Sequence, residues 1–202
     1  MNITVVGATG MVGSKVVAEA VKRGHQVTAV TRSGKEVEGA VKSVTADLTD
    51  TDTIVGLINS SDATVIAVPT DRTGGSPQPV IDAHKAIIAA APTKRIFVVG
   101  GAGSLIVGGI QLKDTPDFPP EFKAEPTAFA QVLDDYRASK GLDWTMISPA
   151  PTIAPGDAAE SYQVADDSPA GEYVSNGTFA VAILDELEKP AHREARFTVA
   201  ER

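Results

Sequence analysis

Short apolar runs alternate with longer helical patterns along the chain. The apolar runs are rich in β-branched residues and are bounded by Gly, Pro, Asp or Ser, which is typical of strands. These runs predict strands over residues 3–6, 27–30, 41–45, 64–68, 96–99, 145–147 and 196–199. The segments between them predict helices over residues 14–23, 52–59, 79–91, 127–139 and 178–188.

Strands and helices that alternate in this way indicate right-handed crossover connections and a parallel sheet. The apolar runs are almost continuous, as expected for strands that helices cover on both faces. The 202 residues contain no internal repeat, low-complexity tract or linker. The predicted fold class is therefore α/β, a single doubly wound domain with a parallel sheet over residues 1–202.

Two long segments interrupt this alternation, residues 69–79 and residues 100–126, and both are rich in Gly and Pro. Loops of this length inside a compact domain are usually functional or mobile. Both follow the C-terminal ends of predicted strands, where open α/β sheets bind their ligands. We therefore expect a ligand site at that edge of the sheet.

A glycine motif follows the first predicted strand, with two residues between successive glycines. The first glycine permits a sharp turn, the second removes a side chain where a pyrophosphate approaches, and the third allows close packing of helix on strand. Amide groups at the start of the helix can then bind phosphates. The motif predicts a Rossmann-like dinucleotide-binding domain, and a tight turn without a ligand is the alternative. The residues expected to contact the cofactor here are Gly7, Thr9, Gly10, Met11, Val12 and Gly13.

The second predicted strand is followed by Arg32 and Ser33. A site selective for NAD places a carboxylate here to bind the ribose diol. An arginine instead offers a planar cation for a 2′-phosphate, and the Ser33 hydroxyl and the charge of Lys35 are close by in the sequence. NADP(H) is therefore favoured over NAD(H), and a solvated arginine is the alternative interpretation.

Two further strand ends can contact the cofactor. Asp47 can accept a hydrogen bond from the adenine amino group, with Leu48 lining that pocket, although a turn or capping role for Asp47 is equally compatible. After the fourth predicted strand, Ala67, Val68 and Pro69 would run past the ribose of the cofactor.

Charge and composition exclude several kinds of binding partner and chemistry and indicate where the protein is located. The chain has 18 basic and 26 acidic residues, a net charge of −8, which argues against a nucleic acid or a membrane surface as partner. The absence of cysteine excludes disulfides, thiolate metal sites and cysteine nucleophiles. No apolar stretch reaches the roughly 20 residues that span a bilayer. Because the N-terminus begins on a strand-like run, we expect a cytoplasmic protein.

Five stretches of the chain carry a family resemblance. They are GATGMVG (7–13), GGAGSL (100–105), DTPDFP (114–119), LDWTMISPAPTIAPG (142–156) and LDELEKPAHREARFTVA (184–200). Together they resemble the atypical short-chain dehydrogenase/reductase superfamily, and within it the NAD(P)H-flavin reductase group related to biliverdin reductase B. The resemblance implies a Rossmann-like sheet, NADPH as the usual cofactor, and hydride transfer to a flavin or another flat acceptor.

The chain departs from that group at the start of the last predicted helix. Such sequences often carry an Ile-Ser-x-x-Asp-Tyr-Ala stretch, whereas this one reads VSNGTFA over residues 174–180. Thr178 and Phe179 therefore replace an aspartate and a tyrosine, so any polar contact of that pair is expected to be lost. Ser175 or Asn176 can still cap the helix.

A Tyr-x-x-x-Lys pair, Tyr136 with Lys140, matches the acid–base pair with which short-chain dehydrogenases reduce carbonyls. In working enzymes of that class the pair lies early in a long helix. Here Tyr136 lies in the last turn of its predicted helix, only 13 residues before Pro149. A lysine at a helix end is explained by the helix dipole, so we interpret the pair as non-catalytic.

Ser104, after the fifth predicted strand, is the candidate catalytic residue. The resemblance implies a place beside the nicotinamide, where its hydroxyl can bond the acceptor, and a turn-closing role is the alternative. Glycines here would let the backbone approach the cofactor, and the end of the sixth strand would wall the nicotinamide side. The residues expected in these two roles are Gly100, Gly101, Gly103, Pro149 and Ala150.

The other chemistry-bearing side chains predict no separate site. His25, His84 and His192 are scattered without metal-ligand spacing, so no metal site is expected. We expect His84 at the surface or half-buried on its helix. Phe118 and Phe122 can cover an acceptor as a lid, although loop packing is the stronger explanation.

Without a well-placed acid, the acceptor must need little proton transfer from the protein. Flavins and quinones meet this condition, since solvent can supply their proton and the protein need only offer a flat slot over the nicotinamide. The sequence therefore predicts an NAD(P)H-dependent oxidoreductase, monomeric or homodimeric, that reduces a small-molecule acceptor such as FMN, FAD or a quinone. The alternatives are an NmrA-like dinucleotide-binding redox sensor without turnover and, less favoured, a sugar-nucleotide epimerase.

Overall fold

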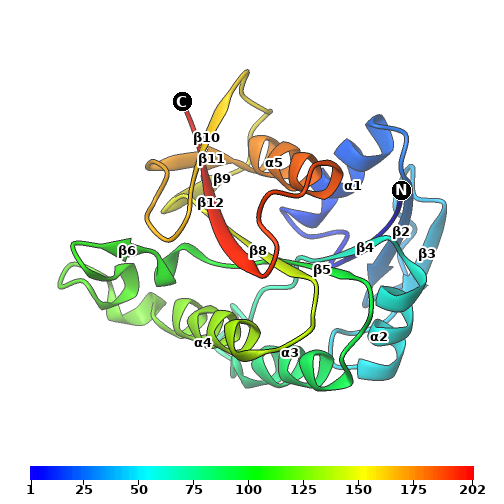
Figure 1. Ribbon diagram of the computed structural model, residues 1–202, viewed down its shortest axis with the longest axis horizontal. Helices are drawn as coiled ribbons and strands as arrows, with labels where there is room; N and C mark the ends of the chain where they lie inside the picture. The colour runs from blue at the N-terminus through cyan, green and yellow to red at the C-terminus, as the bar shows by residue number, and fades with distance from the viewer.

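The predicted apolar runs form the central sheet of the computed structural model, which describes all residues 1–202 (Figure 1). The sheet contains eight strands in the order β3-β2-β1-β4-β5-β8-β12-β10. Neighbouring strands pair in parallel except β10 with β12. The strands are β1 (Asn2–Val6), β2 (Gln26–Thr31), β3 (Lys42–Thr45), β4 (Ala63–Ile66), β5 (Arg95–Val99), β8 (Trp144–Pro149), β10 (Tyr162–Ala165) and β12 (Ala195–Glu201).

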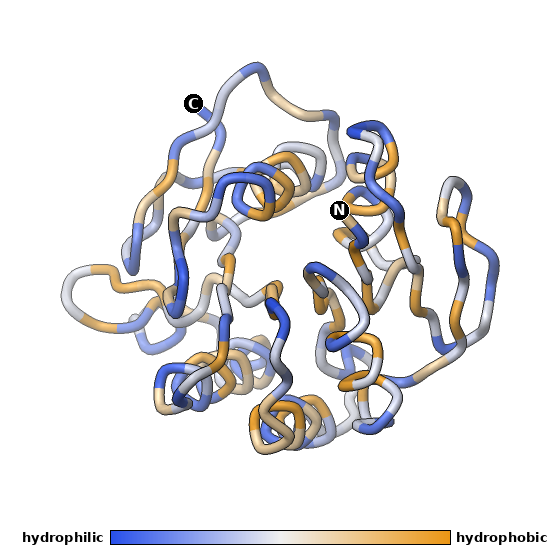
Figure 2. Tube along the Cα trace, turned by 45° about the vertical axis from the view of Figure 1, so that its right-hand side comes forward, coloured by the Kyte–Doolittle hydropathy of each residue, from blue (hydrophilic) through white to orange (hydrophobic).

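Five α-helices cover the two faces of this sheet. They are α1 (Gly13–Lys22), α2 (Thr51–Ser60), α3 (Gln78–Ala90), α4 (Ala124–Ala138) and α5 (Asn176–Glu188). Figure 1 shows α1 and α5 on one face and α2, α3 and α4 on the other. In Figure 2 hydrophobic and hydrophilic residues alternate along the helices, as expected for helices that turn one face toward a sheet and the other toward solvent. The predicted α/β class with a doubly wound, mostly parallel sheet is confirmed.

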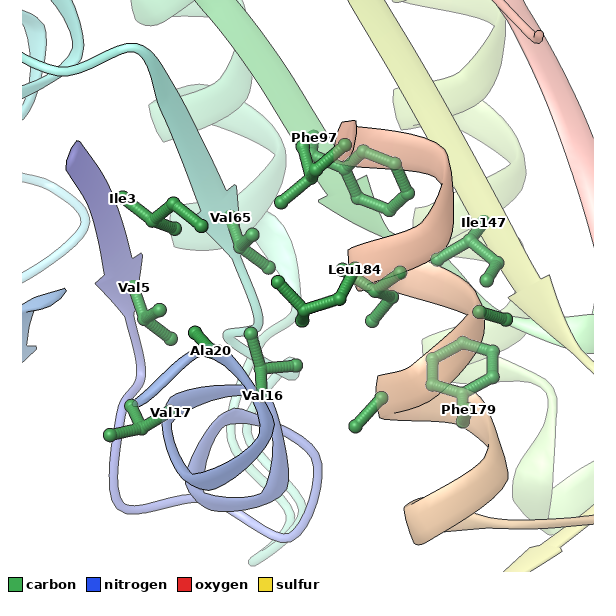
Figure 3. Packing of buried hydrophobic residues seen from close by; sticks show 14 of the residues in the cluster. Ile3, Val5, Val16, Val17, Ala20, Val65, Phe97, Ile147, Phe179 and Leu184 are labelled. Atoms are coloured by element: carbon green, nitrogen blue, oxygen red, sulfur yellow. The ribbon is translucent and has the colours of Figure 1, made fainter. Parts of the chain in front are cut away.

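Each face of the sheet has its own hydrophobic core. On the α1 and α5 side, Val16, Val17 and Ala20 of α1 contact strand residues such as Ile3 and Val5 (Figure 3). The buried residues of α1 recur three and four positions apart, which is the spacing of one helix face. The second core lies beneath α2, α3 and α4. These two cores hold the strands rigidly and leave the strand ends and loops free to carry function.

The ends of the helices agree with their local sequence. Asp50 accepts a hydrogen bond from the Thr53 amide at 3.3 Å and caps α2. Ser175 accepts one from the Thr178 amide at 3.0 Å, so the predicted cap of α5 is confirmed. Helix α4 begins at Ala124, three residues before its predicted start, because Pro126 is tolerated in a first helical turn.

The two long loops differ in their content. Residues 67–77 contain no helix or strand. The segment after β5 contains the hairpin β6 (Ile106–Val107) and β7 (Ile110–Gln111), and three 3-10 turns, Ala102–Ser104, Leu112–Asp114 and Pro120–Phe122. The Arg72 guanidinium joins the two loops, since it donates two hydrogen bonds of 2.9 Å to the Glu125 carboxylate at the start of α4.

Besides the β6–β7 hairpin, three further short strands were not predicted. β9 (Thr152–Ala154) and β11 (Tyr173–Ser175) pair in parallel, and β10 forms the antiparallel edge of the main sheet. None of the helices combines the length and the apolar character needed to cross a bilayer.

One predicted position is wrong: His84 is neither at the surface nor half-buried. It is fully buried between α3 and α4, where its Nδ1 lies 3.2 Å from the Tyr136 hydroxyl. Its Nε2 has no hydrogen-bond partner. The interface with α4 buries His84 against Tyr136, whose ring in turn packs on Trp144.

His84 gives a pH-dependent contribution to stability. Burial lowers its pKa from 6.5 to about 4 in the folded protein. Protonation therefore favours the unfolded chain, so this contribution is intact above pH 6.5 and is lost as the pH falls toward 4. Between pH 8 and pH 5.5 we expect the wild type to lose about 1.4 kcal/mol more free energy of unfolding than His84→Gln, measured by urea denaturation. Parallel pH dependence in the two proteins would contradict neutral burial of His84.

Candidate functional site

The candidate site lies where the C-terminal ends of the parallel strands meet. The chain reverses its direction of travel across the sheet between β1 and β4, and such switch points bind ligands in doubly wound sheets. Strands lie about 4.8 Å apart, so the edge extends about 14 Å from β1 to β8 and about 10 Å from β1 to β3. An elongated ligand centred over β1 can therefore contact the ends of the six strands from β3 to β8 in the sheet order.

The first and third glycines of the motif are required by close backbone contacts. Gly7 has a φ of 85°, and a Cβ there would lie 2.5 Å from the Ala67 carbonyl oxygen at the end of β4. A Cβ on Gly13 would lie 2.1 Å from the Gly7 carbonyl oxygen. The geometry therefore agrees with the predicted sharp turn at Gly7 and the close approach of α1 to the strand at Gly13.

The loop between these glycines presents free amide groups. The Gly10 amide donates to the Gly7 carbonyl and the Ser14 amide to the Gly10 carbonyl, both at 3.0 Å. The amides of Thr9, Met11 and Val12 have no acceptor within the protein. They lie at the positive end of the α1 dipole, so the loop is a cradle of backbone amides that fits a diphosphate.

A buried asparagine fixes this cradle from behind. Asn176, at the start of α5, is 4% exposed. Its Nδ2 donates to the Met11 carbonyl at 2.9 Å, and its Oδ1 accepts from the Gly156 amide at 3.0 Å. The sequence indicated Asn176 only as a helix cap, because nothing local shows that residues 11 and 176 meet.

The part of the sheet edge that follows β2 and β3, on one side of the cradle, carries charged side chains. Arg32 and Ser33 are exposed directly after β2. The Asp47 Oδ1 accepts from the Thr49 amide at 3.0 Å and from the Thr49 hydroxyl at 2.7 Å. These bonds, and the charge of Arg32, hold the pKa of Asp47 below its usual value. The bonds are those of a turn, yet the second carboxylate oxygen of Asp47 stays free for a ligand.

A second carboxylate near Arg32 was not found from the sequence. Asp71, in the loop after β4, accepts from the Thr73 hydroxyl and amide, both at 2.6 Å. These bonds lower its pKa, and the charge of Arg32 adds to the effect. Arg32 therefore stands within electrostatic reach of both Asp47 and Asp71.

Several of the residues predicted to contact the cofactor are buried beneath the sheet edge. Leu48 is 4% exposed and Ala150 is fully buried, so both pack in the cores. Ala67 is 8% exposed, Val68 is half-buried and Pro69 is exposed. Pro149, the last residue of β8, is buried.

Ser104 lies in the 3-10 turn after β5 and is 5% exposed. Its Oγ accepts a hydrogen bond of 3.1 Å from Nη1 of Arg196, a buried residue of β12 that sequence analysis did not single out. The neighbouring glycines serve internal packing, since a Cβ on Gly103 would lie 2.3 Å from the Pro126 side chain. A Cβ on Gly100 would lie 2.7 Å from the Met146 sulfur, whereas Gly101 has more room.

Tyr136 lies in the second core, away from the strand ends. It has no exposed surface, and burial raises its pKa. Its ring packs against Trp144 with a centroid separation of 5.6 Å. Lys140 is exposed after the end of α4. The structure therefore does not bring this pair to the site, and no group of three potential metal-ligating His, Asp or Glu side chains was found.

The fold and the glycine cradle together define a dinucleotide-binding α/β protein. The family model described as NAD(P)H-binding matches residues 7–190. The chain therefore belongs to this NAD(P)H-binding family, which establishes a nicotinamide dinucleotide as its cofactor.

Individual relatives extend the comparison over the whole chain. The protein YwnB of Bacillus subtilis is 35% identical and covers 98% of both sequences. A Streptococcus pneumoniae structure, provisionally named an NADH-flavin reductase, is 32% identical, with a TM-score of 0.85 and full coverage of both chains. A Bacteroides thetaiotaomicron structure, provisionally named an epimerase, is 31% identical, with a TM-score of 0.86 and coverage of 99% of this chain and 96% of the other.

The glycine cradle makes a direct prediction for cofactor binding. Gly10→Val should fold but weaken binding of NADPH by at least about 100-fold, because the second glycine of such a motif keeps a side chain away from the approaching diphosphate. Isothermal titration calorimetry and thermal melting measure the two properties. Gly56→Val is the control, since Gly56 lies on α2 with no atom near its Cβ position. Wild-type affinity in Gly10→Val would exclude phosphate binding at this loop.

Proposed function

We propose that the protein is an NAD(P)H-dependent oxidoreductase that transfers hydride to a flavin or quinone-like acceptor. The observation that carries this proposal is the burial of Tyr136 in the second core. With that phenol inaccessible, the tyrosine that would protonate a carbonyl substrate in a short-chain dehydrogenase is not available at the strand ends. Flavins and quinones need none, because their reduced rings take a proton from solvent.

The residues of the edge have distinct roles in this proposal. The free amides of Thr9, Met11 and Val12 bind the diphosphate. The Ser104 hydroxyl, in the turn after β5, orients the acceptor over the cofactor. Binding of the two reactants in one fixed geometry supplies most of the rate enhancement, since no covalent intermediate with the protein is formed.

The bound nicotinamide supplies the hydride. The acceptor gains this hydride, which is two electrons and one hydrogen nucleus, and takes one proton from solvent. One reduced cofactor and one oxidised acceptor therefore give one oxidised cofactor and one two-electron-reduced acceptor. The resemblance to the Streptococcus pneumoniae structure, whose provisional name is NADH-flavin reductase, supports this assignment.

Steady-state oxidation of NADPH tests the proposal with FMN, FAD, menadione and dichlorophenolindophenol as acceptors. We expect acceptor-dependent turnover, and we expect Tyr136→Phe to retain it within about two-fold because the phenol lies in the core. Micromolar binding of NADPH without turnover of any acceptor would instead support a redox sensor. A large loss of kcat in Tyr136→Phe would contradict the non-catalytic assignment.

The epimerase alternative is supported by the provisional name of the Bacteroides thetaiotaomicron structure. Epimerases of this superfamily use the Tyr-x-x-x-Lys pair as acid and base. In this chain Tyr136 is buried against His84 and Trp144, so that chemistry has no accessible phenol. Epimerisation of a sugar nucleotide that Tyr136→Phe abolishes would reverse this preference.

We further propose NADPH as the preferred cofactor, because Arg32 is the exposed cation after β2 where a ribose 2′-phosphate would lie. Arg32→Ala should raise KM at least about 10-fold more for NADPH than for NADH, since only NADPH carries the 2′-phosphate. Lys22→Ala is the matched control, because Lys22 is an exposed cation at the far end of α1. Equal effects of Arg32→Ala on the two cofactors would remove Arg32 from the 2′-phosphate.

A further inference from the structure

A buried guanidinium lies directly behind Ser104. The Arg196 side chain is only 1% exposed. Its Nη1 donates to the Ser104 Oγ at 3.1 Å and to the Ser148 Oγ at 3.3 Å, and its Nη2 donates to the Ser104 carbonyl at 3.4 Å. Arg196 therefore connects β12 and the end of β8 to the turn after β5.

The charge of this guanidinium is compensated by the Asp167 carboxylate. Its Nε donates to the Asp167 Oδ1 at 2.7 Å, and its Nη2 donates to the same oxygen. The Asp167 carboxylate also accepts from Arg137 Nη2 at 2.7 Å and is 48% exposed. A carboxylate shared with two arginines and partly open to water neutralises Arg196 without displacing it from Ser104.

The direction of the Ser104 hydroxyl follows from the chemistry of arginine. A guanidinium only donates hydrogen bonds, so the bond to Arg196 uses a lone pair of the Ser104 oxygen. The Ser104 hydrogen therefore points elsewhere, and no acceptor for it exists within the protein. Ser104 is left as a hydrogen-bond donor whose oxygen a cation already polarises.

We propose that Arg196 is a positioning residue that makes Ser104 a donor to a carbonyl oxygen of the acceptor. This inference rests on the proposed function and deepens it, since it defines the acceptor by a ring carbonyl that flavins and quinones share. That oxygen gains negative charge as the hydride arrives. A donor held ready for the developing charge lowers the barrier more than it strengthens ground-state binding.

The test compares Ser104→Ala, Arg196→Met and their double variant, with menadione as the acceptor. Ser104→Ala should lower kcat by about 100-fold, as for loss of one preorganised donor, and Arg196→Met by about 10-fold. The double variant should be no slower than Ser104→Ala, because Arg196 acts through Ser104. KM for NADPH and the calorimetric Kd of NADP⁺ should stay within about two-fold of wild type.

Arg137→Met is the matched control. Arg137 contacts the same Asp167 carboxylate but does not reach Ser104, so its loss should leave kcat near the wild-type value. Arg196→Lys keeps a cation and should recover part of the activity lost in Arg196→Met. If Arg196→Met does not fold, Arg196→Lys replaces it in the comparison with Ser104→Ala. Wild-type kcat in both Arg196→Lys and Ser104→Ala would then overturn the inference.

The outcomes separate this inference from the proposed function. Wild-type kcat in a folded Arg196→Met, or losses that multiply in the double variant, would overturn the role of Arg196 while turnover itself remains. A parallel weakening of NADP⁺ binding would assign Arg196 to the support of the cofactor site instead. Absence of turnover in the wild type would overturn the proposed function, and this inference with it.

Discussion

The contact between the first and third glycines is the constraint on which the site depends. Because no side chain separates Gly13 from the Gly7 carbonyl, α1 begins directly above the end of β1. That position turns the amides of Thr9, Met11 and Val12 outward at the positive end of the helix. It also places the cradle at the switch point, with three strand ends available on one side for the reactive half of a dinucleotide and two on the other for its adenosine.

Residues at the strand ends are held from within by buried polar groups. Asn176 bonds the carbonyl side of the cradle, and Arg196 bonds the hydroxyl of Ser104. Both are buried and both come from the last 30 residues of the chain. Polar groups that are buried with satisfied hydrogen bonds fix the geometry of their partners, so the C-terminal segment orients the site without lining it.

The sequence predicted what is periodic and local. The strands of the parallel sheet and all five helices follow from patterns of apolar residues, and the glycine turn follows from its spacing. The fourth strand ends at Ile66, two residues before its predicted end, because β1 turns away at Gly7 and the last bond to it is that of the Ala67 amide to the Val6 carbonyl. Strand boundaries of this kind depend on a neighbouring strand and are not encoded locally.

Contacts between distant residues were not predicted from the sequence. Strands β9, β10 and β11 are three or four residues long, and each pairs with a strand that is distant in the sequence. His84 was expected at the surface or half-buried, because nothing in its own helix shows that α4 covers it. Arg196 and Asp71 gave no motif, because their relation to Ser104 and Arg32 exists only in three dimensions. The fold was thus largely predictable, whereas the support of the site was not.

The hydrogen bond between Asn176 and Met11 also joins the two ends of the chain into one cooperative unit. A fragment that ends before α5 would keep the whole glycine signature and yet leave the Met11 carbonyl unpaired and α1 without its neighbour on the sheet. Occupancy of the nucleotide cradle must therefore stabilise the C-terminal helix, by thermodynamic linkage, as much as it stabilises the N-terminal strand. In this protein a nucleotide-binding signature of seven residues acts only as part of a structure of 202 residues.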